Sequence, residues 1–219
     1  ERLEEGRLRY LALDEAGRKE FFYCRRDCYN AQKAAVDFTA FSDAWIERAA
    51  DLIFLNKTCY NGLYRVNAAG HFNAPIGRYA NPQIFDADNL LAVSELLQRA
   101  TIQCGPFEQC RPHVDSRTFV YFDPPYRPLS PTANFTAYAA DRFGDAEQRR
   151  LGAFFAELDA TTGARLMLSN SDPKNVDPDD RFFDDLYAPF TIRRVSAGRL
   201  INSVAGRRGK ITEILVTNY

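Results

Sequence analysis

The sequence FVYFDPPY, residues 119–126, carries the strongest indication of the fold. The apolar and aromatic run 119–122 is typical of a short buried β-strand. Proline cannot donate to a strand ladder, so the strand must end at Asp123. Ligands of open α/β sheets bind where the strands end. The sequence therefore predicts a strand that delivers an acid, two prolines and a tyrosine to the ligand-binding edge of an α/β sheet.

The sequence around this strand alternates between β-rich and helical runs. A helical run begins near Asp145, the expected N-cap, and continues to Leu158. This alternation predicts that residues 98–219 form a sheet domain of the α/β class. The strands are expected at 101–104, 118–122, 165–168, 191–195 and 211–217.

The first half of the chain has a different texture. Helical spacing of apolar residues predicts helices over 14–30, from an N-cap at Ser42 to a stop at Asn56, and over 88–99. The segment 56–79 is rich in Asn, Gly and aromatic residues, which suits an exposed hairpin or loop. Residues 1–97 are therefore expected to form a mainly helical module that carries this hairpin.

Composition restricts the class of protein. The 219 residues are 46% apolar, which allows a sizeable core, and no apolar run is long enough to cross a bilayer. The opening residues lack the apolar stretch of a secretory signal. Five cysteines, an odd number at irregular spacing, favour a reducing compartment, so we expect a cytoplasmic protein without disulfides. Two histidines are too few to favour a zinc site, and no metal is expected.

Charge gives only local support for a nucleic-acid partner. The formal net charge is -1, whereas DNA-binding proteins usually carry a basic excess. For each local group of cations, a scatter of solvated surface charges remains the alternative. The two groups are Lys57, Arg65 and Arg78 in the first half, and Arg193, Arg194, Arg199, Arg207, Arg208 and Lys210 near the end.

The residues after the strand match one particular chemistry. The lone pair of an exocyclic aromatic amine is delocalised into its ring, so the nitrogen is a poor nucleophile. The Asp123 carboxylate and the Pro124 carbonyl can each accept one amino hydrogen and localise that lone pair, while the prolines fix the direction of the carbonyl. Tyr126 offers a flat face for an extruded base. An ordinary strand exit, with Asp123 bonded to backbone and Tyr126 packed on the surface, is the alternative.

Several segments resemble one family in the same order. FVYFDPPYRPLS (119–130) is similar to the catalytic motif of the Dam-type, or D12 class, DNA adenine N6-methyltransferases, and LNKTCYNGLYRVNAAGHFNAPIGRY (55–79) resembles their DNA-recognition hairpin. The resemblance extends over essentially the whole chain. The other matching segments are FFYCRRDCYN (21–30), MLSNSD (167–172) and RLINSVAGRRGKITEILVTNY (199–219).

This resemblance implies a fold and an activity. The fold would be a Rossmann-like methyltransferase sheet with an inserted, mainly helical target-recognition domain. The activity would be that of a site-specific adenine DNA-methyltransferase, which moves a methyl group from S-adenosylmethionine to an adenine flipped out of double-stranded DNA. GATC is the leading expectation for the target. A role in restriction-modification or in DNA replication and repair stays open, and a monomer is expected.

The resemblance also implies roles for individual residues. Asp123 and Pro124 would bind the amino group, Pro125 would complete the motif, and Tyr126 would stack on the adenine. Asp123 and Phe107 would lie near the cofactor. Arg65 is the candidate reader of a base edge and Leu63 the candidate wedge, with loop packing as the alternative for Leu63 and Pro75. The full DNA-binding set is Tyr60, Asn61, Leu63, Arg65, Asn67, Pro75, Arg78 and Arg207.

The sequence departs from the family pattern in two places. The family's N-terminal cofactor-binding elements do not occur in this sequence. We expect that a truncation accounts for this difference. Gly105-Pro106-Phe107 stands where the family usually has Gly-Asp-Phe, so only Phe107 is carried over. Alternatives are a non-catalytic DNA-binding remnant without a cofactor site, or a methyltransferase for the N4 amine of cytosine or for adenine in RNA.

Overall fold

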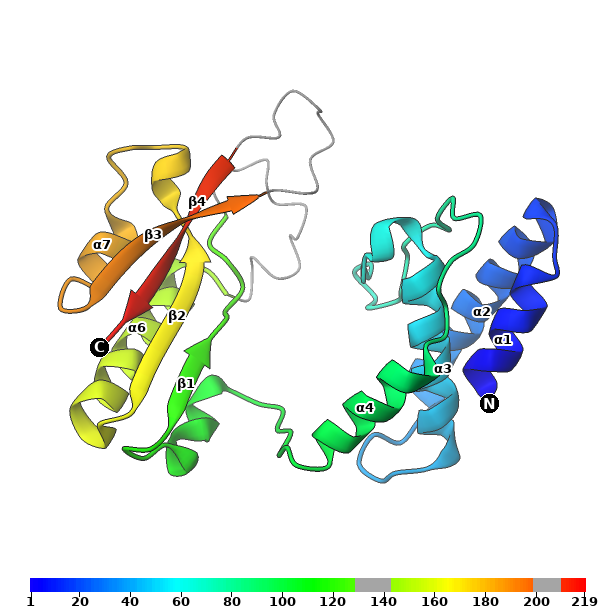
Figure 1. Cartoon of the computed structure of the whole chain (residues 1–219), viewed down its shortest axis with the longest axis horizontal. Helices are drawn as coiled ribbons and strands as arrows, with labels where there is room; N and C mark the ends of the chain where they lie inside the picture. The colour runs from blue at the N-terminus through cyan, green and yellow to red at the C-terminus, as the bar shows by residue number, and fades with distance from the viewer. Residues whose placement is uncertain (129–142, 199–209) are drawn as a thin grey trace. The chain divides into compact units, whose positions relative to one another are not determined.

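A computed structural model describes residues 1–128, 143–198 and 210–219 (Figure 1). The chain divides into two compact units, Glu1–Ile102 and Gln103–Tyr219. The first is mainly helical, and the second is built on a sheet. Each unit has its own hydrophobic core, so each is described by itself.

The second unit contains a four-stranded mixed sheet in the order β1-β2-β4-β3. β1 runs parallel to β2, while β4 is antiparallel to both of its neighbours. The predicted α/β class is therefore confirmed for the described residues, and four of the five expected strands are present with ends shifted by one to three residues. Their bounds are Phe119–Phe122 (β1), Arg165–Ser171 (β2), Thr191–Gly198 (β3) and Lys210–Thr217 (β4).

The expected strand at 101–104 is wrong. These residues pair with no strand in the described parts of the chain, and Ile102 is 76% exposed. A short β-rich run forms a strand only where it finds a partner and a surface to cover. Gly105 and Pro106 interrupt the run before it finds either, and the 3₁₀ helix η2 (Phe107–His113) follows at once.

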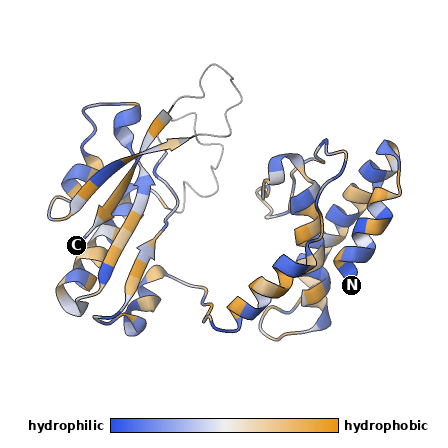
Figure 2. Ribbon diagram, viewed as in Figure 1, coloured by the Kyte–Doolittle hydropathy of each residue, from blue (hydrophilic) through white to orange (hydrophobic). Residues whose placement is uncertain are grey.

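Helix α6 (Asp145–Thr162) connects β1 to β2 and covers the sheet. Its Phe155 and Leu158 are fully buried in one core with Leu166 and Leu168 of β2. Figure 2 shows hydrophobic residues along β2. The N-cap is Gly144 rather than the expected Asp145, because the Glu147 carboxylate accepts a hydrogen bond from the Gly144 N–H at 3.1 Å.

The first unit packs three helices, α1 (Arg2–Leu11), α2 (Glu15–Ala35) and α3 (Asp43–Thr58), and adds α4 (Ala87–Leu97). The three expected helices are confirmed, whereas α1 was not predicted. Asn56 does not stop α3 as expected, since the Thr58 hydroxyl donates to the Phe54 carbonyl at 2.7 Å and extends the last turn.

The segment after α3 is anchored in this helical core. Phe72 and Ala74 are buried beside Phe22 and Leu55. The Asn30 side chain accepts from the Phe72 N–H at 2.7 Å and donates to the Phe72 carbonyl at 3.0 Å, as a neighbouring strand would. Both backbone groups of Phe72 are thereby satisfied inside the unit.

The remaining short elements are α7 (Phe182–Leu186), η1 (Tyr60–Gly62) and η4 (Pro173–Asn175). Across 1–128, 143–198 and 210–219, no helix combines the length and apolarity needed to traverse a bilayer. In the same residues no group of three or more His, Cys, Asp or Glu is placed to hold a metal ion. The five cysteines are free.

Candidate active site and DNA-binding hairpin

The ends of β1 and β2 bring the acid of the motif next to a polar strand end. The parallel register pairs Phe122 with Leu168, so Asp123 and Ser169 follow on neighbouring strands at the same edge. The Ser169 hydroxyl lies 3.3 Å from Asp123 Oδ1 and 2.8 Å from the Tyr121 hydroxyl. The Ser169 hydroxyl orients the Asp123 carboxylate. Because Asp123 is exposed, this carboxylate is also accessible to a ligand.

A buried polar network fixes the loop that follows Asp123. Gln148 of α6 donates from Nε2 to the Pro125 carbonyl at 2.9 Å, and its Oε1 accepts from Asn170 Nδ2 at 3.2 Å. Asn170 Oδ1 accepts from the Arg127 N–H at 3.0 Å, and the Ser171 hydroxyl donates to the Arg127 carbonyl at 2.7 Å. Gln148 and Asn170 are fully buried. Because buried hydrogen bonds are costly to break, the loop has one preferred path.

The Arg127 side chain anchors the far end of this loop. Its guanidinium donates to Asp145 at 2.8 Å and to Asp180 at 2.7 Å, and lies 4.4 Å from the centroid of the Phe182 ring. Burial alone would raise the pKa of Asp180, but the Phe182 N–H and Arg127 outweigh it and lower that pKa. The ion pair is therefore kept at neutral pH.

Tyr126 lies in this loop, and its side chain reaches β4. Its side chain is 38% exposed, and its hydroxyl lies 3.5 Å from Glu213 Oε2. Burial, together with the nearby carboxylates of Glu213 and Asp123, raises the pKa of Tyr126. Tyr126 consequently remains a neutral aromatic ring with part of its surface open.

In the first unit, the expected hairpin 56–79 folds back through two isolated antiparallel bridges, Cys59–Ile76 and Val66–Phe72. Asn61 and Gly62 both have positive φ, 55° and 61°, which Asn and Gly tolerate best. A shallow cavity of about 320 Å³ on the hairpin brings four of the candidate DNA residues together. It is lined by Tyr60, Leu63, Arg65, Ala74 and Pro75.

The other DNA candidates lie apart from this cavity. Asn67 caps the hairpin tip, since its Oδ1 accepts from the N–H groups of Ala69 at 3.1 Å and His71 at 3.0 Å. Arg78 lines a separate cavity of the same unit. Arg207 lies outside the described residues.

The predicted basic group near the C-terminus is partly structural. Arg194 donates to Asp172 at 3.1 Å and to Asp184 at 2.9 Å, so carboxylates already match its charge. It is therefore a packing residue of the sheet unit. Arg199 and Arg208 lie outside the described residues, like Arg207.

Comparison with known proteins identifies the family. A model of the D12 class N6 adenine-specific DNA methyltransferases matches residues 3–201. The chain belongs to this family. It is 50% identical over its whole length to a type II methyltransferase, M.MjaIII, of Methanocaldococcus jannaschii, of which it covers 71%. It is 42% identical over 80% of its length to the type II methyltransferase M1.LlaDCHI of Lactococcus lactis subsp. cremoris, of which it covers 59%.

A third relative has a name that states its activity. The chain is 33% identical over 94% of its length to a DNA adenine methylase of Serratia marcescens, of which it covers 70%. The resemblance stated from the sequence is thereby confirmed, and the chain is an adenine-specific DNA methyltransferase by family. This result favours adenine in DNA over the two alternatives, cytosine N4 and adenine in RNA.

A D12 class enzyme implies S-adenosylmethionine as methyl donor. The described residues fit part of such a site. Asp123 offers an exposed carboxylate at the strand end, which suits a cationic sulfonium. Phe107 is half-buried, packs 5.6 Å from Phe154 between ring centroids, and has the Arg150 guanidinium 4.7 Å from its ring centroid. An adenine stacked on the Phe107 ring would lie against the same side chain that the Arg150 guanidinium contacts.

Sequence reasoning missed the residues that orient this D12 motif. Ser169 and Asn170 lie in MLSNSD (167–172), whose resemblance to the family indicates only the strand after the catalytic loop and no role for these two residues. Three polar residues that end an apolar strand parallel to β1 are a usable signal, because such strand ends meet at one edge. Gln148 gave no signal, since a glutamine in a charged helix is ordinarily exposed.

Proposed function

We propose that this D12 class chain transfers the methyl group of S-adenosylmethionine to the N6 amine of an adenine extruded from double-stranded DNA. The observation that carries the proposal is the exposed Asp123 carboxylate at the end of β1, oriented by Ser169 at 3.3 Å and followed by a loop whose Pro125 carbonyl is fixed by Gln148. A sulfonium donor supplies an electrophilic methyl group. The chain's own residues supply the geometry of the nucleophile.

In this proposal the amino group binds between two acceptors. Asp123 accepts one amino hydrogen and the Pro124 carbonyl accepts the other, which draws the nitrogen toward tetrahedral geometry and directs its lone pair outward. Pro125 limits the directions that the Pro124 carbonyl can take. The ring of Tyr126 stacks on the base, a contact worth about 1–3 kcal/mol. The proton lost from nitrogen leaves by way of the exposed Asp123 carboxylate to water.

The two parts of the chain have different tasks in this proposal. Residues 98–219 form the catalytic part of a Rossmann-like sheet, and residues 1–97 form an inserted target-recognition domain that carries the hairpin 56–79. Asp123 and Phe107 contribute to the cofactor site, while Tyr60, Asn61, Leu63, Arg65, Asn67, Pro75, Arg78 and Arg207 contribute to the DNA interface. GATC is the proposed target.

Transfer of labelled methyl groups tests the proposal. The chain is incubated with S-adenosylmethionine labelled in its methyl group and with duplex DNA, and the DNA is then digested to nucleosides. We expect the label in N6-methyl-2′-deoxyadenosine, with a single-stranded RNA control unlabelled. Label in N4-methyl-2′-deoxycytidine would contradict the assignment of the target, and DNA that is bound but never labelled would identify a non-catalytic DNA-binding remnant.

Arg65→Ala is expected to relax discrimination at one base pair of the target. The Arg65 side chain is held by Asn73, to whose Oδ1 and carbonyl it donates at 2.8 and 2.9 Å, so its remaining donors are presented in a fixed direction. Loss of a base contact costs about 1–3 kcal/mol at one position. We expect activity on the intact target to fall roughly ten- to a hundred-fold. Methylation of duplexes that each carry one substituted base pair measures the effect.

Lys57→Ala is the control for this panel of duplexes, because it removes an exposed cation in the last turn of α3, just before the hairpin bridges begin. Loss of a phosphate contact weakens binding to all DNA sequences alike, and it lowers the slope of log K against log salt concentration by about one. We expect this uniform pattern for Lys57. The same uniform pattern for Arg65 would show that it contacts the backbone and reads no base.

A further inference from the structure

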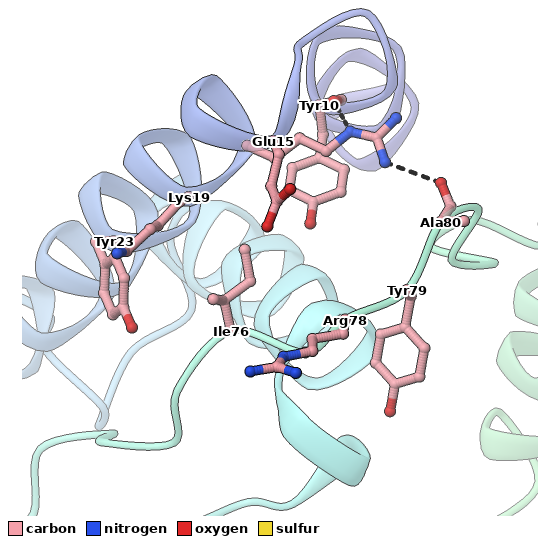
Figure 3. A pocket seen from close by; sticks show the side chains of 10 residues that line it. Tyr10, Glu15, Lys19, Tyr23, Ile76, Arg78, Tyr79 and Ala80 are labelled. Atoms are coloured by element: carbon pink, nitrogen blue, oxygen red, sulfur yellow. Dashed lines mark hydrogen bonds between the residues drawn. The ribbon is translucent and has the colours of Figure 1, made fainter.

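The helical unit has a second cavity, which holds one of the DNA candidates, Arg78, among residues that the proposed function does not assign. It has a volume of about 600 Å³, within the range of about 300–1,000 Å³ typical of ligand sites. Figure 3 shows Lys19 and Tyr23 of α2 on one side and Arg78 and Tyr79 of the segment 76–80 on the other. Tyr10, which is 2% exposed, also lines it.

The walls of this cavity are held in place. Arg18 donates to the Ala80 carbonyl at 2.8 Å and to the Tyr10 carbonyl at 3.2 Å, which ties the segment 76–80 to the helices (Figure 3). At Gly77 a Cβ atom would lie 2.8 Å from the Cys59 carbonyl oxygen and would meet the Tyr79 ring. Only glycine therefore allows Tyr79 to take this position.

The lining is positively charged. Three cations, Arg18, Lys19 and Arg78, face one carboxylate, that of Glu15. The Arg18 guanidinium donates its hydrogen bonds to backbone carbonyls. These carbonyls carry no net charge, so the positive charge of Arg18 is not neutralised by them. Within the described parts of the chain, the side chains of Lys19 and Arg78 form no ion pair or hydrogen bond. Exposed Lys and Arg side chains are the groups that most often contact the phosphates of duplex DNA, and a tyrosine hydroxyl can donate to a phosphate oxygen.

The cavity is continuous with the hairpin that carries the DNA candidates. Ile76 pairs with Cys59, and the Tyr60 N–H donates to the Pro75 carbonyl at 2.8 Å, so one wall of the cavity is formed by the returning limb of the hairpin. Lys19 and Arg78 are both exposed, which leaves the site open to a polymer that runs across it. A duplex seated on the hairpin would bring its adjoining backbone to this wall.

We infer that this cavity binds a phosphodiester of the DNA strand that flanks the target sequence, with Lys19 and Arg78 on opposite sides of the phosphate. The inference rests on the proposed function, because it requires DNA on the hairpin. It extends the footprint of the enzyme onto α2, and Lys19 contributes affinity without reading sequence.

Lys19→Gln tests this assignment in the full chain by fluorescence anisotropy with two duplexes. One duplex ends at the target and the other extends by a full helical turn on each side. We expect Lys19→Gln to weaken binding of the long duplex about five- to ten-fold near 0.1 M salt and to lower its salt slope by about 0.9. The short duplex is expected to bind as it does to the unmodified chain.

Two further variants make the result specific. Arg9→Gln removes an exposed cation of the neighbouring helix α1 outside the cavity and should leave the long duplex unaffected. Lys19→Arg keeps the charge and should retain the slope. An unchanged slope for Lys19→Gln, or an equal loss on both duplexes, overturns the flanking site while the proposed function stands. Absence of DNA binding by the unmodified chain overturns both.

Discussion

Asp123→Ala is expected to reduce methyl transfer about a thousandfold, because it removes the side chain that we propose accepts a hydrogen from the reacting nitrogen. The Asp123 carboxylate is exposed at the end of β1 and is oriented by the Ser169 hydroxyl at 3.3 Å. The side chain forms no other hydrogen bond or ion pair in the described residues, so folding should be unaffected. Single-turnover incorporation of labelled methyl groups at saturating DNA measures the loss, and anisotropy should give a duplex affinity within a few fold of the original.

Asp179→Ala is the matched control for this loss. Asp179 is an exposed aspartate of the same unit, and its side chain forms no hydrogen bond in the part of the chain that the structure describes. It should turn over at the normal rate. If Asp123→Ala retained near-normal turnover, the assignment of the amino-group site to the end of β1 would be wrong.

Gln148→Leu is expected to lower the rate of methyl transfer by roughly ten- to a hundred-fold while leaving DNA affinity unchanged. The substitution leaves the buried Asn170 Nδ2 without its partner, at a cost of about 1–3 kcal/mol, and it releases the Pro125 carbonyl, which is no longer held by α6. The loop that follows Asp123 then loses its preferred path. Measurement of kcat and of KM for DNA separates this loss from a binding defect.

Two variants separate positioning from general destabilisation. Gln148→Glu keeps an acceptor for Asn170, replaces the donor to Pro125 by a carboxylate oxygen and buries a charge, so it should lower kcat at least as much as Gln148→Leu. Leu158→Ala destabilises the same helix by about 2–5 kcal/mol without touching the loop, and should keep normal kcat below its melting temperature. Equal loss of kcat in Leu158→Ala would refute the positioning role of Gln148.

The sequence predicted the features of the sheet unit that depend on local pattern. The apolar run 119–122 and the two prolines determine both the strand and its end, and β1 lies as expected at Phe119–Phe122. The run at 101–104 has similar local preference but no partner strand, so the same reasoning failed there. Local preference decides a strand only where tertiary structure provides a neighbour.

The supporting contacts of the site could not be predicted in the same way. The hydrogen bond from Gln148 to Pro125 joins residues 23 positions apart, and that from Ser169 to Asp123 joins residues 46 apart. Both depend on the register between β1 and β2 and on the rotation of α6 about its axis. Neither quantity leaves a trace in hydrophobic periodicity, which reports only that a face is buried.

The hairpin of the first unit separates the side chains that hold it from those that face solvent. Phe72 is locked to Asn30 and buried with Ala74, whereas Leu63 and Arg65 are exposed and belong to no core. Substitution at an exposed position leaves the anchors intact. If these exposed side chains contact DNA as we propose, a lineage of such enzymes can exchange them one at a time, with every intermediate still folded, and acquire a new target without rebuilding the scaffold.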